Sequence, residues 1–227
     1  MFSEVLDLFK RPVSTMVEKS QEKNIKKESI IAGIIAVIIA ILTILTTYIG
    51  VMKLVNKTYK SLNAYNKKYS FAEVTKSEFK ELKKEAKKSA LENANLTKTF
   101  FKTLAITIVA IALIAGILFA ISFAIKSPKN YLELLTITNR AFIIYALGFI
   151  INTIFSFIYG PIGAILLLAS IVYALLSLAN AFNLLIEVED KDKLVLVSTI
   201  VIGIVIAVLV FIVNSYINSL FSLSNLL

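Results

Sequence analysis

The sequence predicts an all-α fold: a polytopic membrane helical bundle with five transmembrane helices and an extramembrane helical hairpin. Of the 227 residues, 58% are hydrophobic and 17% are charged. The apolar residues are collected into four blocks that contain no charge, at residues 29–52, 103–125, 141–186 and 194–227. A helix needs about 20 apolar residues to cross a hydrocarbon core of ~30 Å, so each block is long enough. Backbone groups in lipid must be paired within the segment, and the blocks are too long for barrel strands.

The third block is about twice the length of one crossing, and Gly160-Pro161 interrupts it near its middle. Proline lacks an amide donor and glycine permits a turn, so we divide the block there. The predicted spans are Ser29–Met52, Thr103–Ile125, Ala141–Tyr159, Pro161–Ile186 and Leu194–Val213. The chain then has four parts in one membrane domain: a tail at 1–28, the first span at 29–52, a hairpin at 53–102, and the remaining spans at 103–227.

The tail at residues 1–28 is predicted to be an amphipathic cytoplasmic segment. Its apolar side chains recur at helical spacing, and Pro12 is suited to begin a second helical piece. Such a helix can lie in the headgroup plane or pack against the bundle, and the sequence favours neither. The candidate interfacial anchors are Phe2, Val5, Leu6 and Phe9.

The segment at residues 53–102 is rich in lysine and is predicted to form a hairpin of two amphipathic helices. Ser70 with Glu73, and Thr75 with Glu78, have the spacing of capping boxes. The apolar residues after them fall roughly on one helical face. The hairpin therefore projects from the first two spans.

Almost all of the excess charge lies in this hairpin, which contributes +8 of the net charge of +9. The simplest interpretation is a solvated helical face with salt bridges. The functional alternative is contact with anionic lipid headgroups or wall polymers, since each lysine near an anionic surface contributes on the order of 1 kcal/mol. Nucleic acid is not expected, because the hairpin has no base-reading motif. The candidate contact residues are Lys80, Lys83, Lys84, Lys87 and Lys88.

An odd number of spans places the two chain ends on opposite sides of the membrane. A count over whole loops slightly favours a cytoplasmic hairpin, with thirteen basic residues against eleven. The positive-inside bias acts mainly within about 15–20 residues of a span end. A count limited to basic residues near span ends favours a cytoplasmic amino end, with the hairpin outside. We therefore expect a cell-membrane protein with its amino end in the cytoplasm and its carboxyl end outside.

Polar residues within the spans predict packing and not chemistry. Arg140 stands at a span end, where a guanidinium normally extends to the interface. Asn152, Asn180 and Asn183 are expected to form hydrogen bonds between helices. Two stripes of small residues predict close helix packing within the chain, with dimerisation as the alternative. They are Ala32, Ala36 and Ala40 in the first span, and Ala112, Gly116, Ala120 and Ala124 in the second.

Enzymatic chemistry is not expected. The chain contains no histidine and no cysteine, so the usual general base, thiol nucleophile and zinc ligands are absent. It also has no phosphate-binding glycine motif. The carboxylates of Glu187, Glu189, Asp190 and Asp192 are interpreted as a hydrophilic turn, with metal binding as the weaker alternative. We predict no catalytic residue, no metal and no cofactor.

Lys10-Arg11-Pro12-Val13-Ser14-Thr15-Met16, the five expected spans and the run NYLELLTITNRAFIIYALGFI together resemble the Yip family of Ypt/Rab-interacting membrane proteins and their prokaryotic relatives. The resemblance covers most of the chain outside the hairpin. It implies a cytosolic amino end and a non-enzymatic protein that organises or shapes membranes. The abundance of Lys, Ile and Asn is typical of a prokaryote with an AT-rich genome.

The function predicted from these observations is that of a multi-pass membrane scaffold or adaptor. It would act through membrane lipids, a membrane protein partner or a second copy of the chain. A small transporter or channel for a neutral or lipidic solute is the alternative. The absence of a repeated half and of a buried ionisable pair disfavours an ion-coupled transporter.

Overall fold

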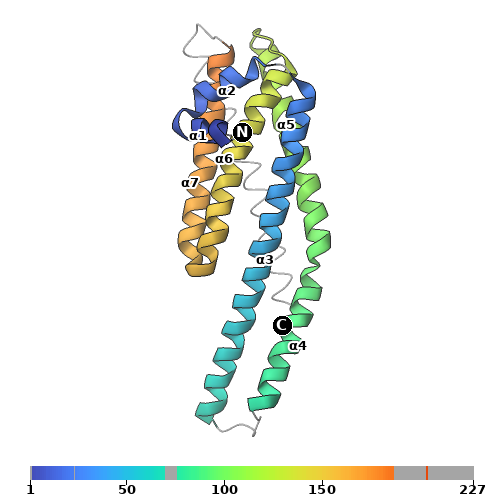
Figure 1. The fold of residues 1–227 in the computed structure, drawn as a ribbon, viewed down its shortest axis with the longest axis vertical. Helices are drawn as coiled ribbons and strands as arrows, with labels where there is room; N and C mark the ends of the chain where they lie inside the picture. The colour runs from blue at the N-terminus through green and yellow to red at the C-terminus, as the bar shows by residue number, and fades with distance from the viewer. Residues whose placement is uncertain (1, 23, 70–75, 187–202, 204–227) are drawn as a thin grey trace. The chain divides into compact units, whose positions relative to one another are not determined.

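The computed structural model describes residues 2–22, 24–69, 76–186 and 203 (Figure 1). Within these ranges the chain is organised into helices, and no strand occurs, so the all-α prediction is confirmed there. The helices are α1 (Phe2–Lys10), α2 (Pro12–Ser20), α3 (Ile25–Tyr69), α4 (Lys76–Ala94), α5 (Leu96–Ala124), α6 (Tyr131–Ile158) and α7 (Gly160–Ile186).

Four helical stretches of the described chain are long and apolar enough to cross a membrane. They are Ile25–Tyr65, Ser77–Ala124, Tyr131–Ile158 and Pro161–Ile186. Each contains or closely matches one of the first four predicted spans. The fifth predicted span, Leu194–Val213, and the carboxylates at 187–192 lie outside the described residues.

The first span and the first arm of the hairpin form one uninterrupted helix, α3. Residues 53–69 contain neither glycine nor proline, so nothing in the backbone ends the helix at the membrane boundary. The second arm is divided at Asn95, whose φ of 39° breaks the helical geometry. Asn95 Oδ1 then accepts a hydrogen bond from Lys98 N at 3.1 Å and caps the start of α5.

The chain forms two compact units. The first combines residues 1–32, 110–145 and 169–227, and the second combines 33–109 and 146–168. The long helices α3, α5, α6 and α7 each contribute residues to both units. Each unit is described below by itself.

The core of the first unit contains side chains from both tail helices as well as from α5, α6 and α7. Leu8 of α1 and Met16 of α2 are completely buried in it. The two tail helices therefore pack against the bundle, one of the two arrangements left open by the sequence (Figure 1). The other buried members are Leu118, Leu134, Ile137, Ala141, Ile144, Ala174, Leu178, Ala179, Ala181, Phe182, Leu185 and Ile186.

Pro12 begins α2, as its position in the sequence predicts. Its fixed φ suits the first helical turn, where the missing amide would have no partner. The preceding helix is held to α7 by Tyr173, whose hydroxyl donates to the carbonyl oxygen of Phe9 at 3.2 Å. The tail is thus attached by a polar contact as well as by burial of Leu8.

In the second unit, α3 contacts α6 through polar side chains. Thr46 Oγ1 and Thr153 Oγ1 lie 3.1 Å apart, and Lys53 donates to the carbonyl oxygen of Ser156. Each threonine hydroxyl also bonds a carbonyl four residues earlier in its own helix, which satisfies it in an apolar setting.

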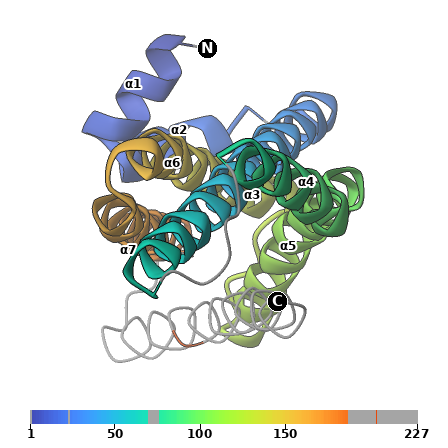
Figure 2. The same cartoon turned by 90° about the horizontal axis from the view of Figure 1, so that it is seen from below.

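The two arms of the hairpin lie side by side in the second unit (Figures 1 and 2). Tyr59 of α3 packs edge-on against Phe79 of α4, with ring centroids 5.3 Å apart. Its hydroxyl donates to the carbonyl oxygen of Leu82 at 2.9 Å. The apolar face of α4 therefore meets α3.

The two predicted stripes of small residues differ in burial. Ala36 and Ala40 of α3 are completely buried. In α5, by contrast, Ala112, Ala120 and Ala124 are exposed. The prediction of intramolecular packing is wrong for this second stripe, because α5 packs through its bulkier face. That face contains Ile111, Ala115 and Leu118.

Candidate functional site: a buried guanidinium between two carboxylates

Arg140 of α6 has the largest completely buried side chain among the described residues, with 0% exposure. The prediction that it extends to the membrane interface is wrong. Its Nη1 and Nη2 donate to Glu28 Oε2 and Oε1 at 3.2 and 3.1 Å. This paired arrangement matches the planar fork of arginine to both oxygens of one carboxylate.

Glu28 reaches Arg140 from the first turn of α3. Asn24 precedes that turn and caps it, because its side-chain oxygen accepts a hydrogen bond from Lys27 N at 3.0 Å. A carboxylate in the first turn is favoured by the helix dipole. The local sequence thus holds Glu28 at a helix end, where it is 3% exposed.

Asn139, the neighbour of Arg140, binds the same glutamate. Its amide nitrogen donates to Glu28 Oε2 at 2.9 Å and to the Glu28 carbonyl oxygen at 3.1 Å. Within the described chain, Asn139 Oδ1 has no hydrogen-bond donor although it is buried. Glu28 therefore receives hydrogen bonds from two consecutive residues of α6.

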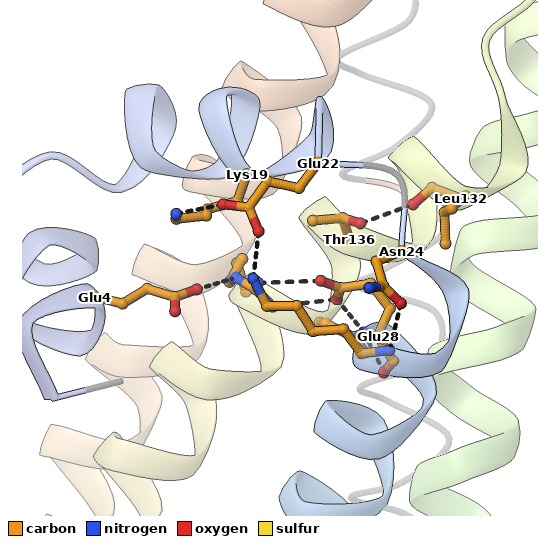
Figure 3. Close-up of polar contacts among 10 residues, drawn as sticks. Glu4, Lys19, Glu22, Asn24, Glu28, Leu132 and Thr136 are labelled. Carbon is orange, nitrogen blue, oxygen red and sulfur yellow. Dashed lines mark hydrogen bonds and ion pairs between the residues drawn. The ribbon is translucent and has the colours of Figure 1, made fainter.

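Glu4 of α1 approaches the guanidinium from another direction (Figure 3). Its Oε1 lies 2.9 Å from Arg140 Nε. The two atoms do not have hydrogen-bond geometry, so the contact is an ion pair and not a hydrogen bond. Because Glu4 is on the tail, the pair connects α1 to α6.

The cluster contains two carboxylates and one guanidinium, all in the first unit. Removing such charges from water costs several kcal/mol per ion, which mutual attraction and hydrogen bonds must offset. Its members come from α1, α3 and α6, so the cluster fixes the relative positions of these three helices. In membrane proteins, buried ionisable groups of this kind are also associated with transport pathways.

A second, more exposed ionic network lies where α2 leads into α3. Glu22 accepts hydrogen bonds from both Lys19 and Lys27 (Figure 3). The hydrogen bond from Lys19, followed by that from Lys27, lowers the pKa of Glu22 to about 2. The same bond to Glu22 raises the pKa of Lys19. Glu22 is therefore ionised throughout the physiological range.

The predicted interfacial anchors do not share one environment. Val5 is half-buried, whereas Leu6 and Phe9 are 43% and 47% exposed. The side chain of Phe2 lies outside the described residues. Burial of Leu8 and Met16 leaves Leu6 and Phe9 as an exposed apolar pair on a helix that is tied to the bundle.

The predicted lysine contacts all lie on α4. Lys80, Lys84 and Lys88 are exposed, and Lys83 and Lys87 are half-buried. Lys88 Nζ lies 3.9 Å from Glu92 Oε1, but its side chain is 80% exposed. Such a long, solvated pair contributes little to stability.

Metal-ligating side chains do not cluster in the described ranges. The arrangement seen there is structural and electrostatic. The charged side chains of the Arg140 cluster that the sequence analysis overlooked are Glu4 and Glu28. For Glu28 the signal was its position directly before one apolar block, with Arg140 directly before another and neither having an opposite charge three or four residues away. Glu4 has no comparable signal in the sequence.

A family model described as "Yip1 domain" matches residues 6–212. The match spans the tail from Leu6, all the longer helices and the hairpin. No match was found among curated proteins or among solved structures.

Proposed function

Since the chain belongs to the Yip1 domain family, as its resemblance predicted, we propose that this multi-pass membrane protein is a non-enzymatic scaffold or adaptor. It has five spans in this proposal, with Leu194–Val213 as the fifth. Its partners are membrane lipids and a membrane protein, which can be a second copy of the chain. The tail and the hairpin make the contacts.

The observation that carries this proposal is the attachment of the tail. An ion pair to Glu4, a hydrogen bond to the Phe9 carbonyl and burial of Leu8 all hold α1 against the bundle. A helix that is held rigidly pays less entropy when a partner binds it. Leu6 and Phe9 are therefore presented as a prearranged apolar contact.

The test is crosslinking in native membranes, followed by purification and mass spectrometry. The variant Leu6→Ser/Phe9→Ser removes the exposed apolar pair of the tail. We expect it to lose the crosslinked partner while retaining its expression level. Ile158→Ser is the matched control, because Ile158 is also an exposed apolar residue, at 75%, but lies at the end of α6, outside the tail and the hairpin.

Retention of every crosslink in the tail variant would contradict the adaptor role of the tail. Loss of the crosslinks in both variants would also contradict it, because the effect would then not depend on the tail surface. A partner that proves to be the chain itself supports the homo-oligomeric form of the proposal.

A small transporter or channel for a neutral or lipidic solute is the second candidate. The cluster of Arg140 with Glu28 and Glu4 is the observation in its favour, because ionisable groups buried within membrane proteins are associated with transport pathways. Liposomes containing the purified protein test this function directly. Solute movement that is lost in Asn180→Ala or Asn183→Ala would overturn the scaffold proposal.

A further inference from the structure

The lysines of α4 form a continuous stripe along the helix, beside the face that packs against α3. At about 100° per residue, the five lysines of the stripe occupy an arc of about 140°. Phe79, which packs against Tyr59 of α3, lies about 40° from Lys83, at one edge of this arc. The lysine stripe, defined here by its members, consists of Lys80, Lys83, Lys84, Lys87 and Lys88.

Glutamates border this stripe along one edge. Glu81 and Glu85 each follow one of the lysines, and Glu92 lies beyond the last one. In helical projection they are adjacent to the lysine arc and not within it. The positive charge therefore forms a row along α4 that is bounded by acids on one side and by the α3 contact on the other.

The direction of the row limits what can bind it. Because α3 is a single helix from Ile25 to Tyr69, the hairpin arm continues along the axis of the first span. The contacts of Tyr59 hold α4 alongside α3, so the row runs away from the membrane. Lys80, Lys84 and Lys88 follow one another at intervals of about 6 Å along it.

We propose that the lysine stripe of α4 binds a linear polyanion with regularly spaced phosphate groups. A planar layer of headgroups meets only the nearest end of a row that leads away from it, whereas a linear chain contacts the whole row. The hairpin contains lysine and no arginine, so its contacts are point charges that suit phosphate oxygens. This inference rests on the proposed scaffold function and names one partner of the hairpin.

Recognition of nucleic acid needs an additional feature. Single strands are bound through bases stacked on aromatic side chains, and the aromatic residue of α4, Phe79, is packed against Tyr59. The stripe therefore offers charge without a stacking surface, and a polymer that lacks bases fits it.

The experiment uses the full chain in nanodiscs of zwitterionic phosphatidylcholine, titrated with fluorescent inorganic polyphosphate at several salt concentrations. The stripe variant is Lys80→Gln/Lys84→Gln/Lys88→Gln. The control is Lys57→Gln/Lys60→Gln/Lys98→Gln, which removes the same charge at exposed positions outside α4. We expect the stripe variant alone to bind more weakly. Its dependence of log K on log salt should become shallower by about two, since each lost contact lowers the slope by about 0.7.

Absence of polyphosphate binding by the unaltered chain overturns the proposal. An equal loss in the two variants also overturns it, because net charge and not the stripe would then be responsible. Abolition of polyphosphate binding in discs that contain phosphatidylglycerol would also overturn the proposal, because it would identify lipid as the occupant. Tighter binding of an oligonucleotide with the same number of phosphates than of polyphosphate would overturn it as well. Because this experiment does not involve the tail, its failure leaves the crosslinking test of the scaffold role intact.

Discussion

Arg140 is buried between two carboxylates that belong to other helices. Such a pair is weak evidence for net stability, because desolvation offsets much of the attraction. Removing one partner is a different matter, since it leaves an uncompensated charge in a place that water does not reach. The pair therefore favours one packing of the helices over others.

We expect Arg140→Met to lower the free energy of unfolding by about 3–5 kcal/mol, because Glu28 is then buried without a counter-charge. The double variant Arg140→Met/Glu28→Met should regain a large part of that loss, because only the partly exposed carboxylate of Glu4 then remains. Chemical unfolding in detergent micelles measures both.

Lys98→Met is the control for this prediction, because it removes a positive charge at an exposed position. If Arg140→Met lowers the free energy of unfolding by no more than the control does, the cluster does not stabilise the fold. Failure of the double variant to recover would mean that the packing, and not the charge, is responsible.

Glu22 provides a test of the ionic network between α2 and α3. Its pKa in the folded chain is about 2, below the ordinary value of 4.5. The stabilisation from its ionised form is therefore complete above pH 4.5 and is lost as the pH falls through 2.

We expect Lys27→Ala to raise the pKa of Glu22, because one of its two hydrogen-bond donors is removed. The carboxyl carbon shift of labelled glutamate, followed by NMR across the acidic range, measures it. If the pKa of Glu22 is unchanged in this variant, Lys27 does not donate a hydrogen bond to Glu22.

At the scale of the elements, the turn between α6 and α7 depends on a close approach at Gly163. A Cβ added there would lie 2.9 Å from the carbonyl oxygen of Asn152 and 3.3 Å from Phe155 Cβ. Backbone cannot move aside as the end of a flexible side chain can. The small residue thus permits α7 to pack directly on α6 in the second unit.

Gly163→Ala should destabilise the protein by about 1–3 kcal/mol, the usual cost of overpacking, as measured by thermal unfolding in detergent. Gly116→Ala is the matched control, because nothing lies within 4 Å of the added Cβ and alanine is the better helix former. If both variants unfold at the same temperature, the approach at Gly163 is not a constraint.

For the whole molecule, orientation is the property to test. The chain has no cysteine, so a single introduced thiol reports one location. With a cytoplasmic amino end, Ser89→Cys on the exposed surface of α4 should react with a membrane-impermeant reagent on intact cells. Ser14→Cys in α2 should react only after permeabilisation. The opposite pattern would reverse the topology.

Several elements followed directly from the residues. The apolar blocks predicted the four long helices that the structure describes, and Pro12 predicted the break between the tail helices. The helical stripe that leaves the first span beyond Met52 is part of one continuous helix, because a change of solvent around a helix leaves its backbone hydrogen bonds intact. The face through which α5 packs was predicted wrongly, because its small-residue stripe is largely exposed.

The sequence by itself determined that this is a helical membrane protein, because apolar length and backbone hydrogen bonding leave few alternatives in lipid. It also determined where the positive charge is concentrated. Only the tertiary structure decided that Arg140, Glu28 and Glu4 meet, since they are far apart in the chain and belong to different helices. Such contacts depend on how helices pack, and helical periodicity describes each helix only by itself.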